Sequence, residues 1–406
     1  MYVYVREAQR SFQVRLACLI LAWLLVACTF CIPVAAQDTG IAAANTDIAA
    51  KNYDKAYLKL KPLADNGNAV AQYYIGVMYE QGLGQAQSYA SAAEWYQKAA
   101  KAGDARAQNN LGLLYETGRG VPEDLSTAVT FYQKAADGGL HQAQYTVGRM
   151  YGEGRGVQQD FVKSALWYQK AAIQGDVAAQ TALGTLYANG TGVTQDDKMA
   201  VRWWLAASEG RSAEGQYLLA RMYSRGKGAI QDEAKAIELD RASAGQGFAP
   251  AQTMLGIRYE TGKAVVQDYK AAVDWYERAA KQGAAQAQNN LAGLIFLGKG
   301  TSQDISAAVS LWRASAEQGY AEAQSNLGLR YLDGKGVAID SAQAFGWLHK
   351  AADQNLAAAQ YNLGVMYFKG TGVAQDIDEA KKWLTKASAQ GNQDAIRGLA
   401  TLTAKE

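Results

Sequence analysis

A sequence repeat of 36 residues constrains this chain more than any other feature. Each period carries a small residue at the same position, and up to Gln360 the next residue is glutamine. The 36-residue spacing holds from Gly67 to Ala395 without insertion or deletion. The small residues are Ala71, Ala107, Ala143, Ala179, Gly215, Ala251, Ala287, Ala323, Ala359 and Ala395. Such a period is the signature of a stacked array, in which each unit buries its apolar face only against its neighbours.

The first half of each period has the pattern of a helix that ends at glycine. Ala107, Leu111 and Tyr115 are spaced four apart and therefore share one face of an α-helix. Gly118 and Gly120 follow, and glycine supplies the positive φ that helix C-termini and tight turns commonly need. We call the predicted element helix A.

The second half of the period predicts another helix, helix B. Asp124 is suited to an N-cap, because its carboxylate can accept hydrogen bonds from the unpaired N–H groups of a helix start. Ala128, Phe131 and Tyr132 form the packing face that follows, and Gly139 ends the helix. The aspartate recurs at Asp124, Asp160, Asp196, Asp232, Asp268, Asp304, Asp340 and Asp376. This regular spacing indicates caps, whereas a catalytic carboxylate pair needs two different environments in one cleft.

The motif residues of one unit resemble the Sel-one-like repeat (SLR) family, a branch of the tetratricopeptide (TPR) superfamily. They are Val147-Gly148, Tyr151, Gly154, Gly156-Val157, Asp160, Trp167-Tyr168, Lys170-Ala171-Ala172 and Gly175. The resemblance covers about residues 68 to 400. It implies an all-α fold, a right-handed α/α superhelical solenoid of about nine 36-residue helix pairs with terminal caps. It also implies a non-catalytic scaffold or adaptor for proteins or peptides in envelope assembly, signalling or host interaction.

Both ends of the chain are predicted to differ from the repeat array. Its segments are a signal peptide at 1–36, an N-terminal capping helix pair at 37–67, the repeat array at 68–391 and a C-terminal capping helix at 392–406. Terminal units that depart from the pattern are expected where no neighbour covers them. Inside the array, Leu239-Asp240 replaces the aromatic pair of other units. This replacement is either local drift or the mark of a weakened, flexible interface near residues 205 to 247.

The first forty residues have the order of a secretory signal. Positive charge at Arg6, Arg10 and Arg15 precedes an apolar run, and small residues up to Ala36 suit a signal peptidase. Cleavage after Ala36 predicts a periplasmic or secreted protein. Two alternatives stay open: lipidation of Cys28, giving a lipid-anchored component of the outer membrane, or an uncleaved N-terminal anchor. Contact with a membrane is expected only through this leader.

The cysteines and charges change with cleavage. Cys18, Cys28 and Cys31 all lie in the leader, so a chain cleaved after Ala36 must gain its stability from packing and not from disulfides. The full chain has 40 basic and 38 acidic residues, and loss of the leader leaves 37 of each. No basic stretch remains to suit a phosphate backbone, so nucleic acid is excluded as an expected partner.

The search for chemistry in the sequence predicts neither a catalytic site nor a cofactor or metal. The two histidines, His141 in a predicted inter-helix turn and His349 on a helix B, lie in different units. Gly298-Lys299-Gly300-Thr301 lacks the Ser or Thr that a phosphate-binding loop places directly after lysine. Some secreted family members are linked to β-lactam binding and weak hydrolysis. A weak β-lactam or cell-wall hydrolase is therefore the alternative, although no serine nucleophile motif is present.

Helix A carries the candidate binding residues, because in tetratricopeptide relatives this helix lines a concave surface. Asparagine amides offer both donor and acceptor to an extended peptide, tyrosine adds apolar area with a polar tip, and arginine suits an acidic partner. The candidates are Asn110, Asn290, Asn326, Asn362, Tyr145, Tyr217, Tyr361, Arg149 and Arg221. The asparagines gather toward the C-terminal end, which predicts the main peptide groove in residues 284 to 391. They could equally tie adjacent helices together.

Overall fold

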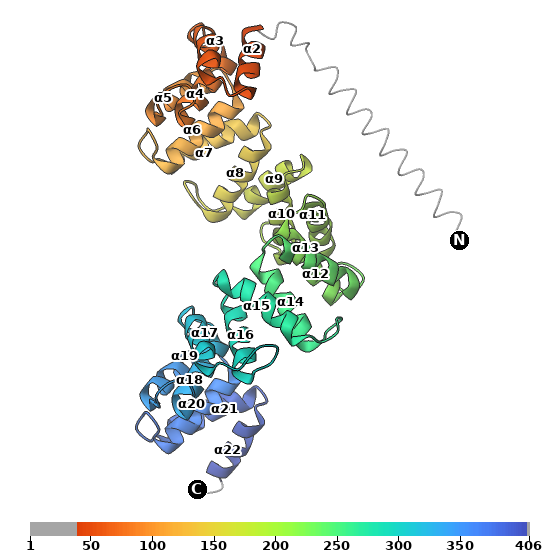
Figure 1. Ribbon diagram of the computed structural model, residues 1–406, viewed down its shortest axis with the longest axis vertical. Helices are drawn as coiled ribbons and strands as arrows, with labels where there is room; N and C mark the ends of the chain where they lie inside the picture. Colours follow the sequence, from red (N-terminus) through yellow and green to blue (C-terminus); the bar gives the residue numbers. More distant parts are fainter. Residues whose placement is uncertain (1–38, 404–406) are drawn as a thin grey trace, which may run out of the picture. The chain divides into compact units, whose positions relative to one another are not determined.

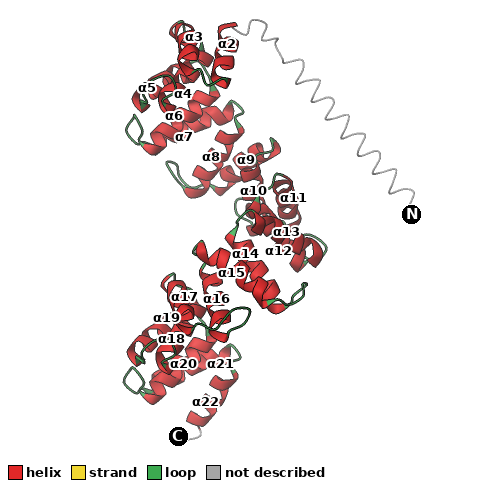
Figure 2. Cartoon of the chain, viewed as in Figure 1, coloured by secondary structure: helices red, strands yellow, loops and turns green. Residues whose placement is uncertain are grey.

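A computed structural model describes residues 39–403, and the predicted signal peptide and Cys28 lie outside this range. Helices joined by loops, without strands, make up the described residues (Figure 2). The A helices are α4 (Ala69–Gln81), α6 (Ala105–Thr117), α8 (His141–Glu153), α10 (Val177–Asn189), α12 (Ala213–Arg225), α14 (Ala249–Thr261), α16 (Ala285–Leu297), α18 (Ala321–Asp333) and α20 (Ala357–Lys369). The B helices are α5 (Tyr89–Lys101), α7 (Leu125–Asp137), α9 (Phe161–Ile173), α11 (Asp197–Glu209), α13 (Glu233–Gly245), α15 (Tyr269–Lys281), α17 (Ile305–Glu317), α19 (Ser341–Asp353) and α21 (Ile377–Ala389). The flanking helices are α2 (Thr39–Ala49), α3 (Tyr53–Asp65) and α22 (Gln393–Thr403).

The predicted helix signals are confirmed at the loops. Gly118 ends α6 with a φ of 65°, and Gly120 follows with a φ of 70°. Asp124 caps α7, its carboxylate accepting from the backbone N–H groups of Ser126 and Thr127, both at 3.0 Å. His141 was expected in a turn, and this expectation is wrong, because it is the first residue of α8.

The apolar core continues from each repeat into the next. One cluster joins Ala128 and Tyr132 of α7 to Val147 and Met150 of α8, and Trp167 of the following helix B covers it. Helix B of one repeat thus packs against helix A of the next, and similar clusters recur along the chain. Because no repeat contains a complete core, the stability of each depends on its neighbours.

The recurring glutamine has a structural role that the sequence did not reveal. Gln108 is buried, and its Nε2 donates to the carbonyl oxygen of Ala100 at the end of the preceding helix B, at 3.2 Å. Gln144, Gln252 and Gln324 make the same bond in their repeats. The Ala100 carbonyl also accepts from the Gly103 N–H at 3.1 Å, so the glutamine adds a second hydrogen bond that ties helix A to the end of the preceding helix B.

The chain divides into two compact units, the first ending at Ala171 and the second beginning at Ala172. Within each unit the helix pairs follow one another in chain order (Figure 1). The predicted all-α solenoid is confirmed. Of the helices that the structure describes, none combines the length and apolar character needed to span a membrane.

Candidate peptide-binding face

The predicted contact residues lie at the fifth, sixth and ninth positions of the A helices, and all of them are half-buried. We call this surface the A-helix face. Asn110, Tyr145 and Arg149 belong to the first unit. The second unit holds Tyr217, Arg221, Asn290, Asn326, Tyr361 and Asn362.

Two of the asparagines hold helix A against the preceding helix B. Asn110 Nδ2 donates to the Tyr96 hydroxyl at 3.1 Å, and Asn290 Nδ2 donates to the Tyr276 hydroxyl at 3.3 Å. The Tyr276 hydroxyl in turn donates to Glu260 at 2.6 Å. Burial, with the hydrogen bond to Glu260, raises the pKa of the Tyr276 phenol, which keeps it a neutral donor. These two amides therefore have a structural function.

In the second unit the amide contacts continue into the next repeat. Asn289 Nδ2 donates to Asn290 Oδ1 at 3.1 Å, and Asn326 Nδ2 donates to Asn289 Oδ1 at 3.0 Å. We call Asn290, Asn289 and Asn326 the amide ladder. An asparagine side chain has two N–H donors and an oxygen acceptor, so Asn326 at the end of the ladder keeps unused capacity. Asn362 has no hydrogen-bond partner within the described part of the chain.

The three candidate tyrosines are partly packed against their own repeats. The Tyr145 ring centroid lies 5.6 Å from that of Tyr168, and the Tyr217 centroid lies 5.6 Å from that of Phe248. Tyr361 packs against the core cluster that contains Leu384. Each ring is therefore held in place by aromatic or aliphatic contacts and stays half-buried.

The two candidate arginines differ in their partners. Arg149 contacts Glu116 and Glu153, each at 3.2 Å, so its charge is already balanced. Burial acts to raise the pKa of Glu116, but hydrogen bonds from Tyr132 and Arg149 outweigh it and hold that pKa below its usual value. Arg221 donates to the Tyr217 hydroxyl at 3.0 Å and has no carboxylate within 4.0 Å among the described residues. Arg221 is therefore the better candidate for an acidic partner.

A buried ionic cluster lies between α13 and α14. Asp240 is 1% exposed and Arg258 is 4% exposed, and their Oδ2 and Nε atoms lie 2.9 Å apart. Arg258 also contacts Glu233 at 2.8 Å. Burial raises the pKa of Asp240 to about 6, although Arg258 and Arg221 act to lower it. The sequence carried a signal for this cluster: a carboxylate in an aromatic position and, one repeat later, an arginine where Met150 and Met366 stand.

The described residues contain no cluster of three or more histidine, cysteine, aspartate or glutamate side chains that could hold a metal ion.

The predicted A-helix face offers amides, phenol rings and one arginine without a carboxylate partner. Chemically, these groups can bind by hydrogen bonding, stacking and charge.

Comparison with known families and structures gives one consistent result. The model of the Sel1 repeat matches residues 69–104, 105–140, 141–176, 177–212, 213–248, 249–283, 285–320, 321–356 and 357–392. No curated protein matches the chain.

Two solved structures are similar over much of the chain. One is a protective antigen with an SLR fold, present in uropathogenic Escherichia coli strains. It is 34% identical, with 87% of this chain and 84% of that chain covered and a TM-score of 0.62. The other is a Sel1 repeat protein from Oxalobacter formigenes, 32% identical, with 59% of this chain and 96% of that chain covered and a TM-score of 0.54. With nine consecutive matches and these two relatives, the chain belongs to the Sel1 repeat family, whose members are commonly protein-interaction scaffolds and typically non-catalytic.

Proposed function

We propose that this chain is an exported, non-catalytic scaffold that binds extended protein segments on the A-helix face of residues 284 to 391. The observation that carries the proposal is the amide ladder. Its hydrogen bonds fix the orientation of Asn289 and Asn326 before any partner arrives. Preorganised polar groups bind more tightly because less conformational entropy is lost on association.

The chemistry of the ladder suits a peptide backbone. A backbone presents one N–H donor and one C=O acceptor per residue, and an asparagine amide can match both. Asn326 and Asn362 occupy the same position in successive repeats, which places one amide per repeat along the face. Tyr361, next to Asn362, adds apolar contact area with a polar tip.

Replacing Asn326 and Asn362 together with alanine is expected to weaken partner binding at least tenfold. The change removes two hydrogen-bonding amides, each contributing about 1 kcal/mol. Partners are first identified by crosslinking in intact cells and mass spectrometry, and binding is then measured by titration of the purified variant. Asn189→Ala, at the exposed end of α10, is the matched control. Unchanged binding in the double variant, at an unchanged melting temperature, would exclude this face as the groove.

Export is proposed from the leader and is tested by the mature N-terminus. The basic, apolar and small-residue order before Gln37 predicts cleavage after Ala36. One structural relative is a protective antigen, and a comparable role outside the cell would require export. Mass spectrometry of the protein from cell fractions is expected to find Gln37 at the N-terminus in the periplasm or medium. A mature chain beginning at lipidated Cys28, or an intact leader, would overturn this cleavage site.

A further inference from the structure

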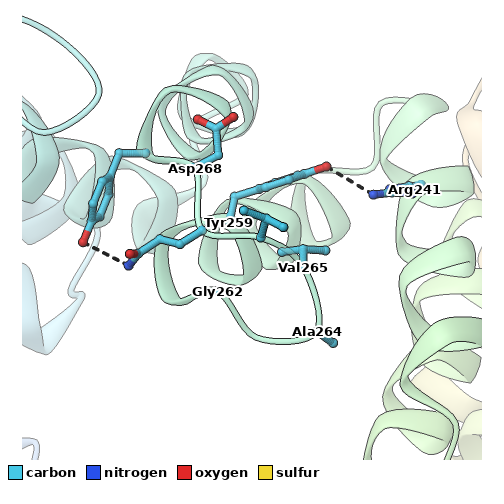
Figure 3. Close-up of a pocket in the computed structure, with 9 residues that line it drawn as sticks. Arg241, Tyr259, Gly262, Ala264, Val265 and Asp268 are labelled. Atoms are coloured by element: carbon cyan, nitrogen blue, oxygen red, sulfur yellow. Dashed lines mark hydrogen bonds between the residues drawn. The ribbon is translucent and has the colours of Figure 1, made fainter.

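A hollow in the second unit lies between α13 and the loop that joins α14 to α15. Its volume is about 1010 Å³, and it is shallow and open. Arg241 reaches the Tyr259 hydroxyl from α13, while Ala264 and Val265 lie on the loop (Figure 3). The residues of the amide ladder do not line this hollow.

Ala264 stands where the other eight repeats have glycine. The glycines are Gly84, Gly120, Gly156, Gly192, Gly228, Gly300, Gly336 and Gly372. Ala264 has a φ of 61°, a left-handed conformation that is strained for a residue with a Cβ atom. A Cβ on Gly300 would lie 2.3 Å from the carbonyl oxygen of Tyr269 in the preceding helix B. Alanine therefore cannot lie as close to helix B as these glycines do, and the loop must stand off.

The two residues that follow Ala264, Val265 and Val266, are both apolar. Val157 and Val337, at the position of Val265 in other repeats, pack against core clusters. Val265 is half-buried as they are, and it also lines the hollow. Val266 is 88% exposed, and Ile230, at the same position of the preceding repeat behind Gly228, is 91% exposed, so this exposure belongs to the position and does not depend on Ala264. Backbone strain such as that at Ala264 concentrates at binding sites, and here it lies in a loop that presents two apolar residues to the hollow.

The hollow contains one guanidinium group beside an aromatic floor. Arg241 Nη2 donates to the Tyr259 hydroxyl at 3.3 Å, and no carboxylate lies within 4.0 Å of Arg241 among the described residues. Packing of the Tyr259 ring against the core cluster of α15 and α16 holds the floor in place. Asp268 also lines the hollow, but its carboxylate caps α15 by accepting from the Ala271 N–H at 3.0 Å.

We propose that this hollow binds the C-terminal residue of a partner polypeptide. The planar guanidinium of Arg241 matches a carboxylate through two parallel hydrogen bonds. An aromatic side chain would lie against Tyr259, Val265 and Val266. At a chain end the carboxylate and the side chain branch from the same carbon, so both fit a site with a single cation next to an apolar wall.

The first test uses N-acetylphenylalanine and its amide, which differ only in the charge of the chain end. Titration of the purified full chain is followed by NMR of labelled valine methyl groups. The acid is expected to shift the Val265 and Val266 signals to saturation, with the amide binding at least tenfold more weakly. Equal binding of the two probes, or no saturable shift with the acid, would overturn the proposal.

Matched variants separate the hollow from a general charge effect. Arg241→Gln is expected to weaken binding of N-acetylphenylalanine at least tenfold. Arg313 occupies the same position on α17, with its guanidinium 5.9 Å from the Tyr331 ring, but its neighbouring loop carries Gly336. Arg313→Gln should therefore leave binding unchanged. An equal loss in both variants would contradict a site at Arg241.

Ala264→Gly tests the role of the strained loop without removing any binding group. Glycine is expected to let the loop settle against α13, which weakens binding at least tenfold and raises the melting temperature. Retention of full affinity in this variant would show that Ala264 does not hold the site open.

Two further probes identify the source of the carboxylate. A pentapeptide that ends in phenylalanine is expected to bind more tightly than 3-phenylpropionic acid, because only the peptide adds backbone hydrogen-bonding groups and further side chains to the carboxylate and the ring. Tighter binding of the free acid would overturn the assignment to a polypeptide. The Asn326→Ala, Asn362→Ala variant should bind both probes as the unaltered chain does. The proposal for this hollow and the proposal for the A-helix face can therefore fail independently.

Discussion

Replacement of Arg258 with methionine is expected to destabilise the second unit by about 3–5 kcal/mol, because it leaves the buried Asp240 carboxylate without its counterion. Asp240 is 1% exposed and its Oδ1 atom has no hydrogen-bond partner, so Arg258 provides its main compensation. Chemical denaturation at pH 7 measures the loss. The matched control is Arg330→Met at the same position of α18. Arg330 lies over the Phe296 ring at 4.6 Å rather than against a buried carboxylate, so its loss should cost about 1 kcal/mol.

The pH dependence of the stability lost in Arg258→Met identifies the cause of that loss. Burial already raises the pKa of Asp240 to about 6, and removal of Arg258 raises it further. A folded-state pKa above the unfolded value gives stability that is present at low pH and lost as pH rises through the folded pKa. The difference between Arg258→Met and the unaltered chain should therefore shrink from pH 7 to pH 5, where the carboxyl is neutral. A penalty that is the same at both values would mean that lost packing, not an unpaired charge, causes it.

A second substitution should reverse the loss. Asp240→Tyr with Arg258→Met restores the aromatic and thioether pairing that Tyr132 and Met150 show in the first unit. Buried ion pairs replaced by well-packed apolar residues are often neutral or stabilising by about 1–4 kcal/mol. The double variant is expected to be at least as stable as the unaltered chain. A double variant as unstable as Arg258→Met alone would show that this interface cannot repack.

The pairing of Asp240 with Arg258 could not be predicted from the sequence, whereas the helix pairs could. The helix pairs follow from local signals that each act alone: alanine and leucine at helical spacing, glycine at turns and aspartate at caps. Asp240 and Arg258 each depart from the repeat, and 18 residues separate them, so neither departure by itself predicts a compensating partner. Only the stacking of α13 on α14 brings the two side chains together.

The roles of the candidate binding residues could be predicted only in part, for a similar reason. The asparagine pattern located Asn110 and Asn290 on helix A, and both the peptide-binding and the helix-tying interpretations fitted it. The hydrogen bonds to Tyr96 and Tyr276 depend on hydroxyl positions in another helix, which a single sequence does not supply. The structure assigns these two amides a structural role, and binding by Asn326 and Asn362 stays a prediction.

Substitution of alanine for Gly300 is expected to cost about 2–4 kcal/mol, combining left-handed strain with overpacking. Its φ is 73°, and an added Cβ would lie 2.3 Å from the carbonyl oxygen of Tyr269. Gly319 is the matched control in the same repeat, because its φ is 89° but an added Cβ meets nothing within 4 Å. Gly319→Ala should therefore cost only the strain, about 1–2 kcal/mol. Urea unfolding of the two variants separates strain from steric overlap.

The response of the Gly300 loop distinguishes two ways in which the chain can accommodate a Cβ atom. If the loop lifts from α15 as the loop at Ala264 stands off α13, hydrogen exchange will quicken at residues 299 to 304 and part of the overlap energy will be relieved. If the loop cannot lift, exchange there will stay slow and the full penalty will appear in unfolding. Equal costs for Gly300→Ala and Gly319→Ala, with unchanged exchange, would show that close approach to helix B does not maintain glycine at this position. In that case the alanine at position 264 would need no compensating function.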